Sequence, residues 1–388
     1  MAEVSLDQLS GDLKVTPGVA RPDNLVSTRP DWINQLTLGK AATALPGLLA
    51  SLFNLCGHAH RLCAGLAVQA ADGGVVPLAD ATRHALRTET LREHLRRIGL
   101  DWPQQLATGS EACSRSQELA LKALQTCPLS LGAQAPARSQ DFSGLPHWLG
   151  QQLLGMPAEQ WLEGWERAPR PWMDDWCEVT PGWLPELLQG AKVVADGHMT
   201  GAPALRLHAA RQDLMAMAGH LRDTHSFARQ PYWRSQCAET GTWTRMNQQA
   251  PEGFDTPWLR LGARLAELVR LSLPDAARRS GAQWLQAGSV CIGDHEGLAW
   301  VEMARGLLIH YVRLDGQGSD ARIGACRVLA PTEWNFHPHG AVAEVLETLP
   351  KVITPDVEQR ILALMAAFDP CVKFDLRSAT LPTEVCHA

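Results

Sequence analysis

The sequence predicts an α+β fold that is predominantly helical. Apolar residues recur at helical spacing over several long segments, and a strong hairpin signal lies near residues 306–330. Of the 388 residues, 45% are hydrophobic, which is enough to build one large domain or two to three smaller ones.

The amino-terminal third is expected to begin with a strand and to continue with helices. Residues 12–15 are typical of a short strand, and residues 41–71 carry apolar residues at helical spacing around Cys56. A helix is predicted over 89–98, ending at Gly99. Its basic residues interleave with glutamates, which is typical of a solvated helix face; they are Arg92, Arg96 and Arg97.

Further along the chain, residues 128–146 are rich in Pro, Gly and Ser and predict a surface connection. Helical periodicity then returns at 205–228 and 259–273. The glycines between 315 and 320 predict a hairpin of strands 306–315 and 322–330, because Gly accepts the positive φ of tight turns.

The carboxyl end combines a helix with a tail. A final helix over 356–368 is expected to stop at Asp369-Pro370, so that Cys371 emerges at a helix end. Residues 378–388 are expected to form a flexible tail, and Cys386-His387 within it makes a weak metal pair.

Composition argues against several classes of protein. The net charge of −6 and the absence of a dense Lys/Arg run give no footprint for nucleic acid, and no window is apolar enough for membrane insertion. The start lacks the pattern of a secretory signal, and the ten cysteines are spread without a disulfide framework. We therefore expect a cytoplasmic protein, in which most cysteines are buried thiols.

Two cysteine strings near opposite ends of the chain are the main chemical signal. Each resembles a Cys-x-x-Cys metal-binding motif that retains only its first cysteine. The second cysteine is replaced by Ala59 in the string that begins at Cys56, and by Phe374 in the string that begins at Cys371. Neither string can close a clasp alone, so a metal would need ligands from both ends of the chain.

Taken together, the motifs resemble the large subunit of nickel-iron hydrogenases. Cys56-Gly57 is similar to its first cysteine motif, and residues 302–306 are similar to its Glu-Ala-Pro-Arg-Gly segment. Residues 331–335 are similar to its Pro-Thr-Thr-Trp-Asn, and residues 369–371 match its Asp-Pro-Cys. The resemblance implies a single domain over 1–388 with the hydrogenase helical bundle, small peripheral β-sheets and the hairpin near 306–330.

The departures from the family are equally informative. In that family the second cysteine of each pair bridges nickel to iron, and here those positions are occupied by Ala59 and Phe374. Such a chain resembles the HupK/HoxV type of hydrogenase accessory protein, a maturation factor. The resemblance implies binding and handover of the iron-dicyano-carbonyl fragment, Fe(CN)2(CO), with the hydrogenase large subunit and other maturation proteins as partners.

The resemblance also implies which residues hold that fragment. Cys56 and Cys371 are the expected thiolate ligands, which suit a soft iron centre. Arg305, Pro331 and Thr332 are expected around the diatomic ligands. Cys63, seven residues after Cys56 and on the same helical face, is an auxiliary candidate, and His60 is another.

Three functions compete at this stage. One is a non-enzymatic scaffold for the iron fragment, and another is a metal-free chaperone that binds hydrogenase partners. The third is a metalloenzyme with an altered site, to which Cys63, His58 and His60 would contribute. For Arg305, the competing interpretation is a surface salt bridge with Glu302 or Asp294.

Overall fold

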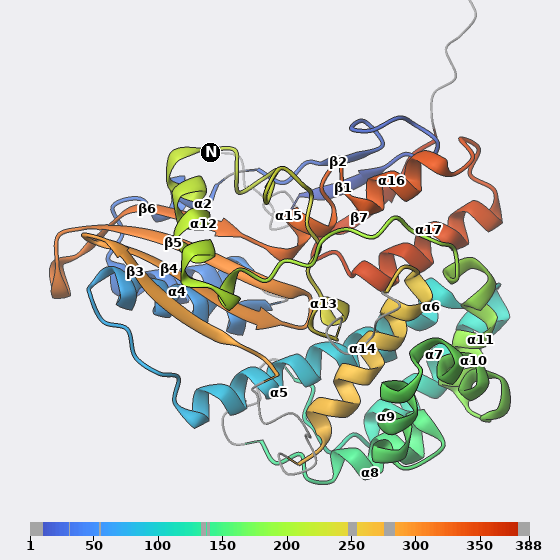
Figure 1. The fold of residues 1–388 in the computed structure, drawn as a ribbon. Helices are drawn as coiled ribbons and strands as arrows, with labels where there is room; N and C mark the ends of the chain where they lie inside the picture. Colours follow the sequence, from blue (N-terminus) through green and yellow to red (C-terminus); the bar gives the residue numbers. More distant parts are fainter. Residues whose placement is uncertain are drawn as a thin grey trace, which may run out of the picture.

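The computed structural model describes residues 11–30, 32–53, 56–132, 137, 140–246, 254–274 and 284–378. Figure 1 shows a four-stranded sheet on one side of the molecule and a bundle of helices on the other. A smaller sheet lies between the two, at the top of the view. The predominantly helical α+β prediction is confirmed.

The four-stranded sheet is antiparallel, with strands in chain order: β3 (Ala287–Gly293), β4 (Glu296–Met303), β5 (Gly306–Asp315) and β6 (Arg322–Leu329). Side chains of β5 alternate between two cores, because successive residues point to opposite faces of a strand. Helix α4 (Gly57–Ala71) covers one face and α12 (Arg211–Asp223) covers the other. The predicted hairpin is therefore confirmed as half of a sheet that is buried on both sides.

A three-stranded sheet joins the two ends of the chain. Its central strand β1 (Asp12–Val15) pairs antiparallel with β2 (Leu25–Ser27) and parallel with β7 (Lys373–Leu376). This pairing places the segment after β2 and the segment before β7 at the same end of the sheet, on opposite sides of β1; the sheet lies at the top of Figure 1.

Three long helices form the centre of the bundle: α5 (Asp80–Arg96), α14 (Pro257–Ser272) and α17 (Pro355–Phe368). Every residue of α14 is buried, although the helix carries three arginines and a glutamate. Buried charges need partners, so the bundle must contain ion pairs. The other described helices are α2 (Ile33–Thr37), α3 (Leu45–Leu52), α6 (Trp102–Leu106), α7 (Ser110–Gln125), α8 (Leu145–Leu149), α9 (Ala158–Arg167), α10 (Pro169–Val179), α11 (Trp183–Ala195), α13 (Thr242–Met246), α15 (Pro331–Asn335) and α16 (Ala341–Thr348).

Two local predictions are wrong. The helix over 89–98 does not end at Gly99, because α5 continues into a π-helical turn over Arg97–Asp101 and then into α6. Arg92 is fully buried rather than solvated, since its guanidinium donates to the Ser130 carbonyl and to Glu89.

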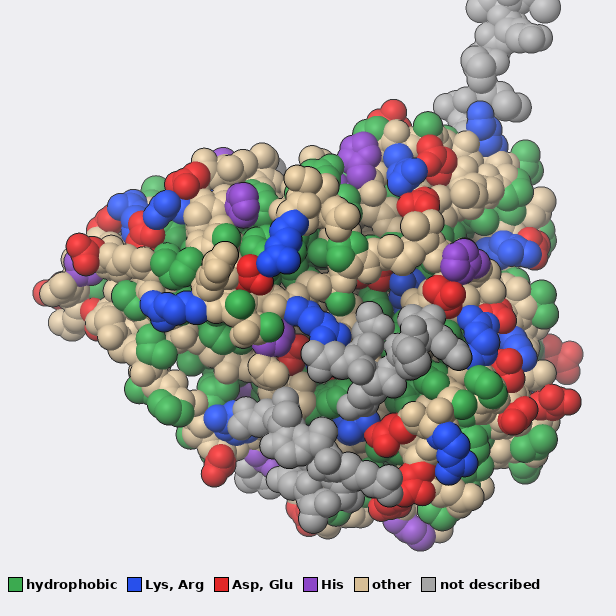
Figure 2. Space-filling model, viewed as in Figure 1, with side chains coloured by type: hydrophobic (Ala, Val, Ile, Leu, Met, Phe, Trp, Pro, Cys, Tyr) green, Lys and Arg blue, Asp and Glu red, His purple; other side chains and the backbone are tan. Residues whose placement is uncertain are grey.

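Other predictions are tested only in part. The strand 12–15, the final helix and its stop before Cys371 are confirmed. Residues 133–136 and 138–139 of the expected connection 128–146, and residues 379–388 of the expected tail, lie outside the described residues. Among the helices that are described, none has the length and apolar character needed to cross a bilayer. On the face drawn in Figure 2, basic and acidic side chains are interspersed.

Candidate functional site

Cys56 immediately precedes α4 and is almost fully buried. Its amide donates to the Phe53 carbonyl at 3.0 Å, which forms a turn between α3 and α4. Gly57 allows α4 to approach α3 closely, because a Cβ there would lie 2.7 Å from the Ala50 carbonyl oxygen. Cys56 and Gly57 together therefore place the Cys56 thiol in the protein interior, at the amino-terminal end of α4.

Cys371 follows the end of α17 and lies against α15. Asp369 ends the helix in the left-handed conformation, with φ of 53°, and Pro370 prevents its continuation. The Thr332 hydroxyl donates to the Cys371 sulfur at 3.0 Å, and Pro331 precedes it in the first turn of α15. The two motifs that contain Thr332 and Cys371 thus meet in one contact.

The two thiols lie within electrostatic reach of each other. Burial raises the pKa of Cys56, the nearby Arg305 opposes this effect, and negative charge at Cys371 raises the pKa further. Cys56, Cys371 and Arg305 therefore lie near one another although they come from distant parts of the chain, and their role as one binding site stays a prediction.

Arg305 occupies the tight turn between β4 and β5, where Met303 pairs with Gly306. Its side chain is buried, with Nη1 2.9 Å from Glu93 Oε2 and Nε 3.4 Å from Asp369 Oδ2. The competing interpretation, a surface salt bridge with Glu302 or Asp294, is wrong, because Arg305 is buried and its described ion pairs are with Glu93 and Asp369.

Asp369 collects arginines from three elements. Its carboxylate lies 2.9 Å from Arg97 Nε and 3.2 Å from Arg264 Nη2, in addition to the contact with Arg305. Although burial raises the pKa of Asp369, these arginines lower it to about 2. The carboxylate is therefore a fixed negative charge two residues before Cys371.

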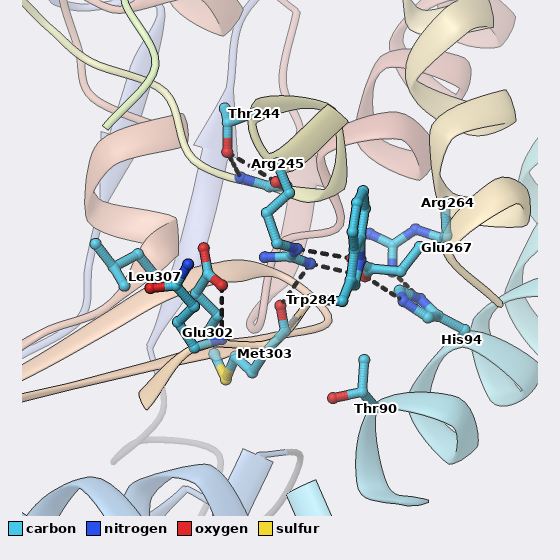
Figure 3. A network of polar contacts seen from close by, with 12 residues as sticks. Thr90, His94, Thr244, Arg245, Arg264, Glu267, Trp284, Glu302, Met303 and Leu307 are labelled. Carbon is cyan, nitrogen blue, oxygen red and sulfur yellow. Dashed lines mark hydrogen bonds and ion pairs between the residues drawn. The ribbon is translucent and has the colours of Figure 1, made fainter. Parts of the chain in front are cut away.

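A second carboxylate extends the network away from the thiols (Figure 3). Glu267 accepts hydrogen bonds from Nε and Nη2 of Arg245, each at 2.7 Å. It also accepts from His94 Nε2 at 2.8 Å and from Trp284 Nε1 at 2.7 Å. Arg264 contacts His94 Nδ1 at 3.2 Å and so connects this cluster to Asp369. The network holds α5, α14 and the β4–β5 turn in fixed relative positions.

The two auxiliary candidates turn toward the four-stranded sheet. His60 stacks on Phe53 with ring centroids 3.8 Å apart, and its Nδ1 lies 3.1 Å from His310 Nε2. The Cys63 thiol donates to the Ala299 carbonyl at 3.4 Å. Neither contact joins them to Cys371, and their role as ligands stays a prediction.

A cavity of about 330 Å³ opens beside Cys56. Both polar and charged groups reach it, among them Arg61, Glu89, Glu93 and Arg96. Within the described part of the chain, no group of three or more His, Cys, Asp or Glu residues is arranged to hold a metal ion. A soft metal bound here would therefore rely on the two thiols and on ligands that it brings with it.

Two residues of this site escape prediction from the sequence. Glu93 lies in a stretch that has the pattern of a solvated helix, and no motif marks Arg29, which follows β2. Arg29 is held by Glu333, 3.4 Å away, beside the segment that contacts Cys371. Arg29 follows β2, and the pairing of β1 with both β2 and β7 brings it to the end of the sheet near Cys371. This pairing joins the two ends of the chain, and no local sequence pattern reveals it.

Glu302 provides a pH test of this region. Burial raises its pKa to about 7, even though Arg245 opposes the shift (Figure 3). The unfolded carboxyl ionises at lower pH than the folded one, so this group destabilises the fold increasingly as pH rises from about 4.5 to 7. Glu302→Gln removes that effect. We expect the free energy of unfolding of the variant, measured in urea, to rise by about 1–3 kcal/mol relative to that of wild type between pH 5 and pH 8. A difference between the two proteins that does not change with pH would contradict the raised pKa of Glu302.

Comparison with known proteins agrees with the geometry. No protein-family model matches the chain. It is 37% identical over 384 residues to the hydrogenase expression/formation protein HoxV of Cupriavidus necator, covering 98% of both chains. It is 31% identical to the hydrogenase expression/formation protein HupK of Rhizobium leguminosarum bv. viciae, covering 94% of this chain and 95% of the relative.

Solved structures show the same fold at low sequence identity. An NAD+-reducing [NiFe]-hydrogenase matches with a TM-score of 0.52 at 15% identity, covering 89% of this chain and 91% of that one. The Ni-Fe-Se hydrogenase of D. vulgaris Hildenborough matches with a TM-score of 0.53 at 13% identity, covering 89% and 92%. The chain therefore belongs to the HoxV/HupK family of hydrogenase expression/formation proteins and has the fold of a nickel-iron hydrogenase large subunit.

Proposed function

We propose that this protein binds the iron-dicyano-carbonyl fragment during hydrogenase maturation and hands it to the hydrogenase large subunit. The observation that carries the proposal is that buried Cys56, half-buried Cys371 and buried Arg305, which come from distant parts of the sequence, lie close enough to influence one another electrostatically. The relatives are named for hydrogenase expression and formation, which supports a role in maturation.

The thiols suit a cargo that must be released. Low-spin iron with cyanide and carbon monoxide ligands is a soft centre, and thiolate sulfur is a matching ligand. Ala59 stands on buried α4 and Phe374 on β7, where second cysteines would complete a four-sulfur nickel site. Two sulfurs leave coordination positions open, which favours exchange over a permanent hold.

The surrounding groups suit the diatomic ligands. Cyanide nitrogens are hydrogen-bond acceptors and need donors that are already fixed and shielded from water. Arg305 is fixed by Glu93 and Asp369, and the Thr332 hydroxyl is fixed beside Cys371. Pro331 adds an apolar surface next to these donors. Binding to the thiols also releases their protons, so loading is expected to be favoured by higher pH.

The decisive experiment is infrared spectroscopy of protein purified without oxygen from cells that express the maturation machinery. Wild type is expected to show cyanide and carbon monoxide stretches that are at least tenfold weaker in Cys56→Ala and in Cys371→Ala. Cys291→Ala is the matched control, because this thiol lies on β3 and its described contact is with the Gly293 carbonyl.

The other outcomes separate the competing functions. Bands that survive both exchanges would contradict the assignment of the ligands. Wild-type protein without bands, together with intact hydrogenase maturation in both variants, would favour a metal-free chaperone. The proposed partners are the large subunit and other maturation proteins, and the proposed compartment is the cytoplasm.

A further inference from the structure

Arg29 is a largely buried cation whose partners belong to, or are bonded to, the two cysteine segments. Its side chain is 14% exposed and its guanidinium lies 5.2 Å from the centre of the Phe53 ring. The carbonyl of Phe53 accepts the amide N–H of Cys56, so the residue whose ring contacts Arg29 is also hydrogen-bonded to the first cysteine.

The other partner of Arg29 leads to the second cysteine. Glu333 Oε1 lies 3.4 Å from Arg29 Nη1, and Glu333 follows Thr332, which donates to the Cys371 sulfur. Burial lowers the pKa of Arg29, but Cys371, Glu333 and Cys56 together raise it above its ordinary value. Negative charge at either cysteine would therefore favour the cationic form of this one guanidinium.

The backbone around Arg29 is fixed as well. The amide of Thr28 donates to the Asp12 carbonyl at 2.9 Å, which continues the β1–β2 pairing up to Arg29. Gly11 has φ of 66°, and a Cβ there would lie 2.5 Å from the Arg29 Cα. Since β1 also pairs with β7, the same sheet positions Arg29 and the segment after Cys371.

The charge of the cargo explains why a second cation is needed. Iron(II) with two cyanides is neutral, and two thiolate ligands make the bound group a dianion. Arg305 pairs with Glu93 and shares Asp369 with Arg97 and Arg264, so part of its charge is already offset. An uncompensated dianion in a buried site would be costly.

Arg29 is better placed to supply that charge. Among the described residues, its ion pair is with Glu333 alone, at a distance longer than a strong charge-assisted hydrogen bond. A guanidinium carries five N–H donors, so donors remain that a cyanide nitrogen or a thiolate can accept.

We propose that Arg29 binds the dianionic iron group directly, donating hydrogen bonds to its cyanide or thiolate ligands. This inference rests on the proposed function, and it identifies Arg29 as the residue that favours an anionic cargo over a bare metal ion.

The test uses purified metal-free protein and a synthetic dicyano-carbonyl iron(II) complex, added without oxygen. Arg29→Gln is expected to bind the complex about tenfold to hundredfold more weakly, the loss expected for one hydrogen bond to a charged group. The carbon monoxide band of the bound fraction is expected at lower wavenumber, because less positive charge nearby leaves iron more electron-rich. Arg29→Lys, which keeps the charge, is expected to bind with intermediate affinity.

Arg229→Gln is the matched control, because Arg229 and Arg29 both line a groove that also contains Phe53 and Glu333, and that is separate from the cavity beside Cys56. It is expected to leave affinity and band positions unchanged. Equal affinity and equal bands for wild type and Arg29→Gln would overturn the inference, as would failure of wild type to bind the synthetic complex.

Thermal unfolding of each variant separates a misfolded protein from a weakened site. If Arg29→Gln misfolds, the comparison of Arg29→Lys with wild type replaces it. Wild-type affinity and band position in Arg29→Lys would then count against the inference, and weaker binding with a shifted band would support it.

The result that would contradict the proposed function differs from the result that would contradict the role of Arg29. Protein isolated from maturing cells without bands, alongside Arg29-dependent binding of the synthetic complex, would reject the handover role and keep the anion site.

Discussion

Asp369→Asn is expected to lower the free energy of unfolding by about 3–5 kcal/mol, the loss typical when one partner of a buried ion pair is removed. The substitution leaves Arg264, which is 1% exposed, with His94 as its remaining described partner. Asn tolerates the left-handed conformation found at this position, so the loss reports charge and not backbone strain. Chemical unfolding at pH 7 measures it.

The pH dependence gives a second readout of the same residue. The pKa of Asp369 is lowered from 3.8 to about 2, so its stabilisation is full above pH 4 and disappears as pH falls toward 2. The gap between wild type and Asp369→Asn should therefore narrow over that range. Asp375→Asn is the matched control, since Asp375 is exposed and pairs with exposed Arg377; its effect should stay within about 0.5 kcal/mol. Equal losses for both variants would show that Asp369 does not anchor the arginines.

The periodic elements were predictable because their cause is local. The hairpin followed from turn glycines, and α17 followed from an apolar stripe that ends at Asp369-Pro370. Strands β3 and β4 were missed, although β4 contains the strand residues that precede Arg305. Their pairing depends on contacts with the hairpin and with α4, which no local pattern reveals.

The site was predictable to the extent that motifs mark it. Cys56, Arg305, Thr332 and Cys371 came from motif resemblance; the structure joins Thr332 to Cys371 by a hydrogen bond and brings Arg305 near Cys56, while their role in binding stays a prediction. The prediction of a solvated helix face was wrong because charged residues were assumed to be exposed. Arg92 and Glu93 alternate in sign like a solvated face, but α5 is covered by α14 and by the 128–132 segment, so their charges are satisfied internally.

Glu267→Gln is expected to be as destabilising as the change at Asp369, by about 3–5 kcal/mol. Glu267 is fully buried and accepts hydrogen bonds from Arg245, His94 and Trp284. Burial raises the pKa of Glu267, but Arg245 and His94 bring it well below its ordinary value, so the ionised form is present at neutral pH. A neutral amide leaves the Arg245 guanidinium buried without a carboxylate. Exposed Glu118, paired with Lys122, is the control, and Glu118→Gln should leave stability almost unchanged because solvent screens this pair.

The double variant asks whether the two carboxylates act as one network. Arg264 contacts both Asp369 and, through His94, the group around Glu267, so each substitution alters the environment of the other. Residues in a shared network typically show coupling energies of about 0.5–3 kcal/mol, whereas independent sites add. Losses in Asp369→Asn and Glu267→Gln that sum to the loss in the double variant would mean that the two carboxylates stabilise the fold independently. A measurable coupling would show that α14, far from both cysteines in the sequence, fixes the charge next to Cys371.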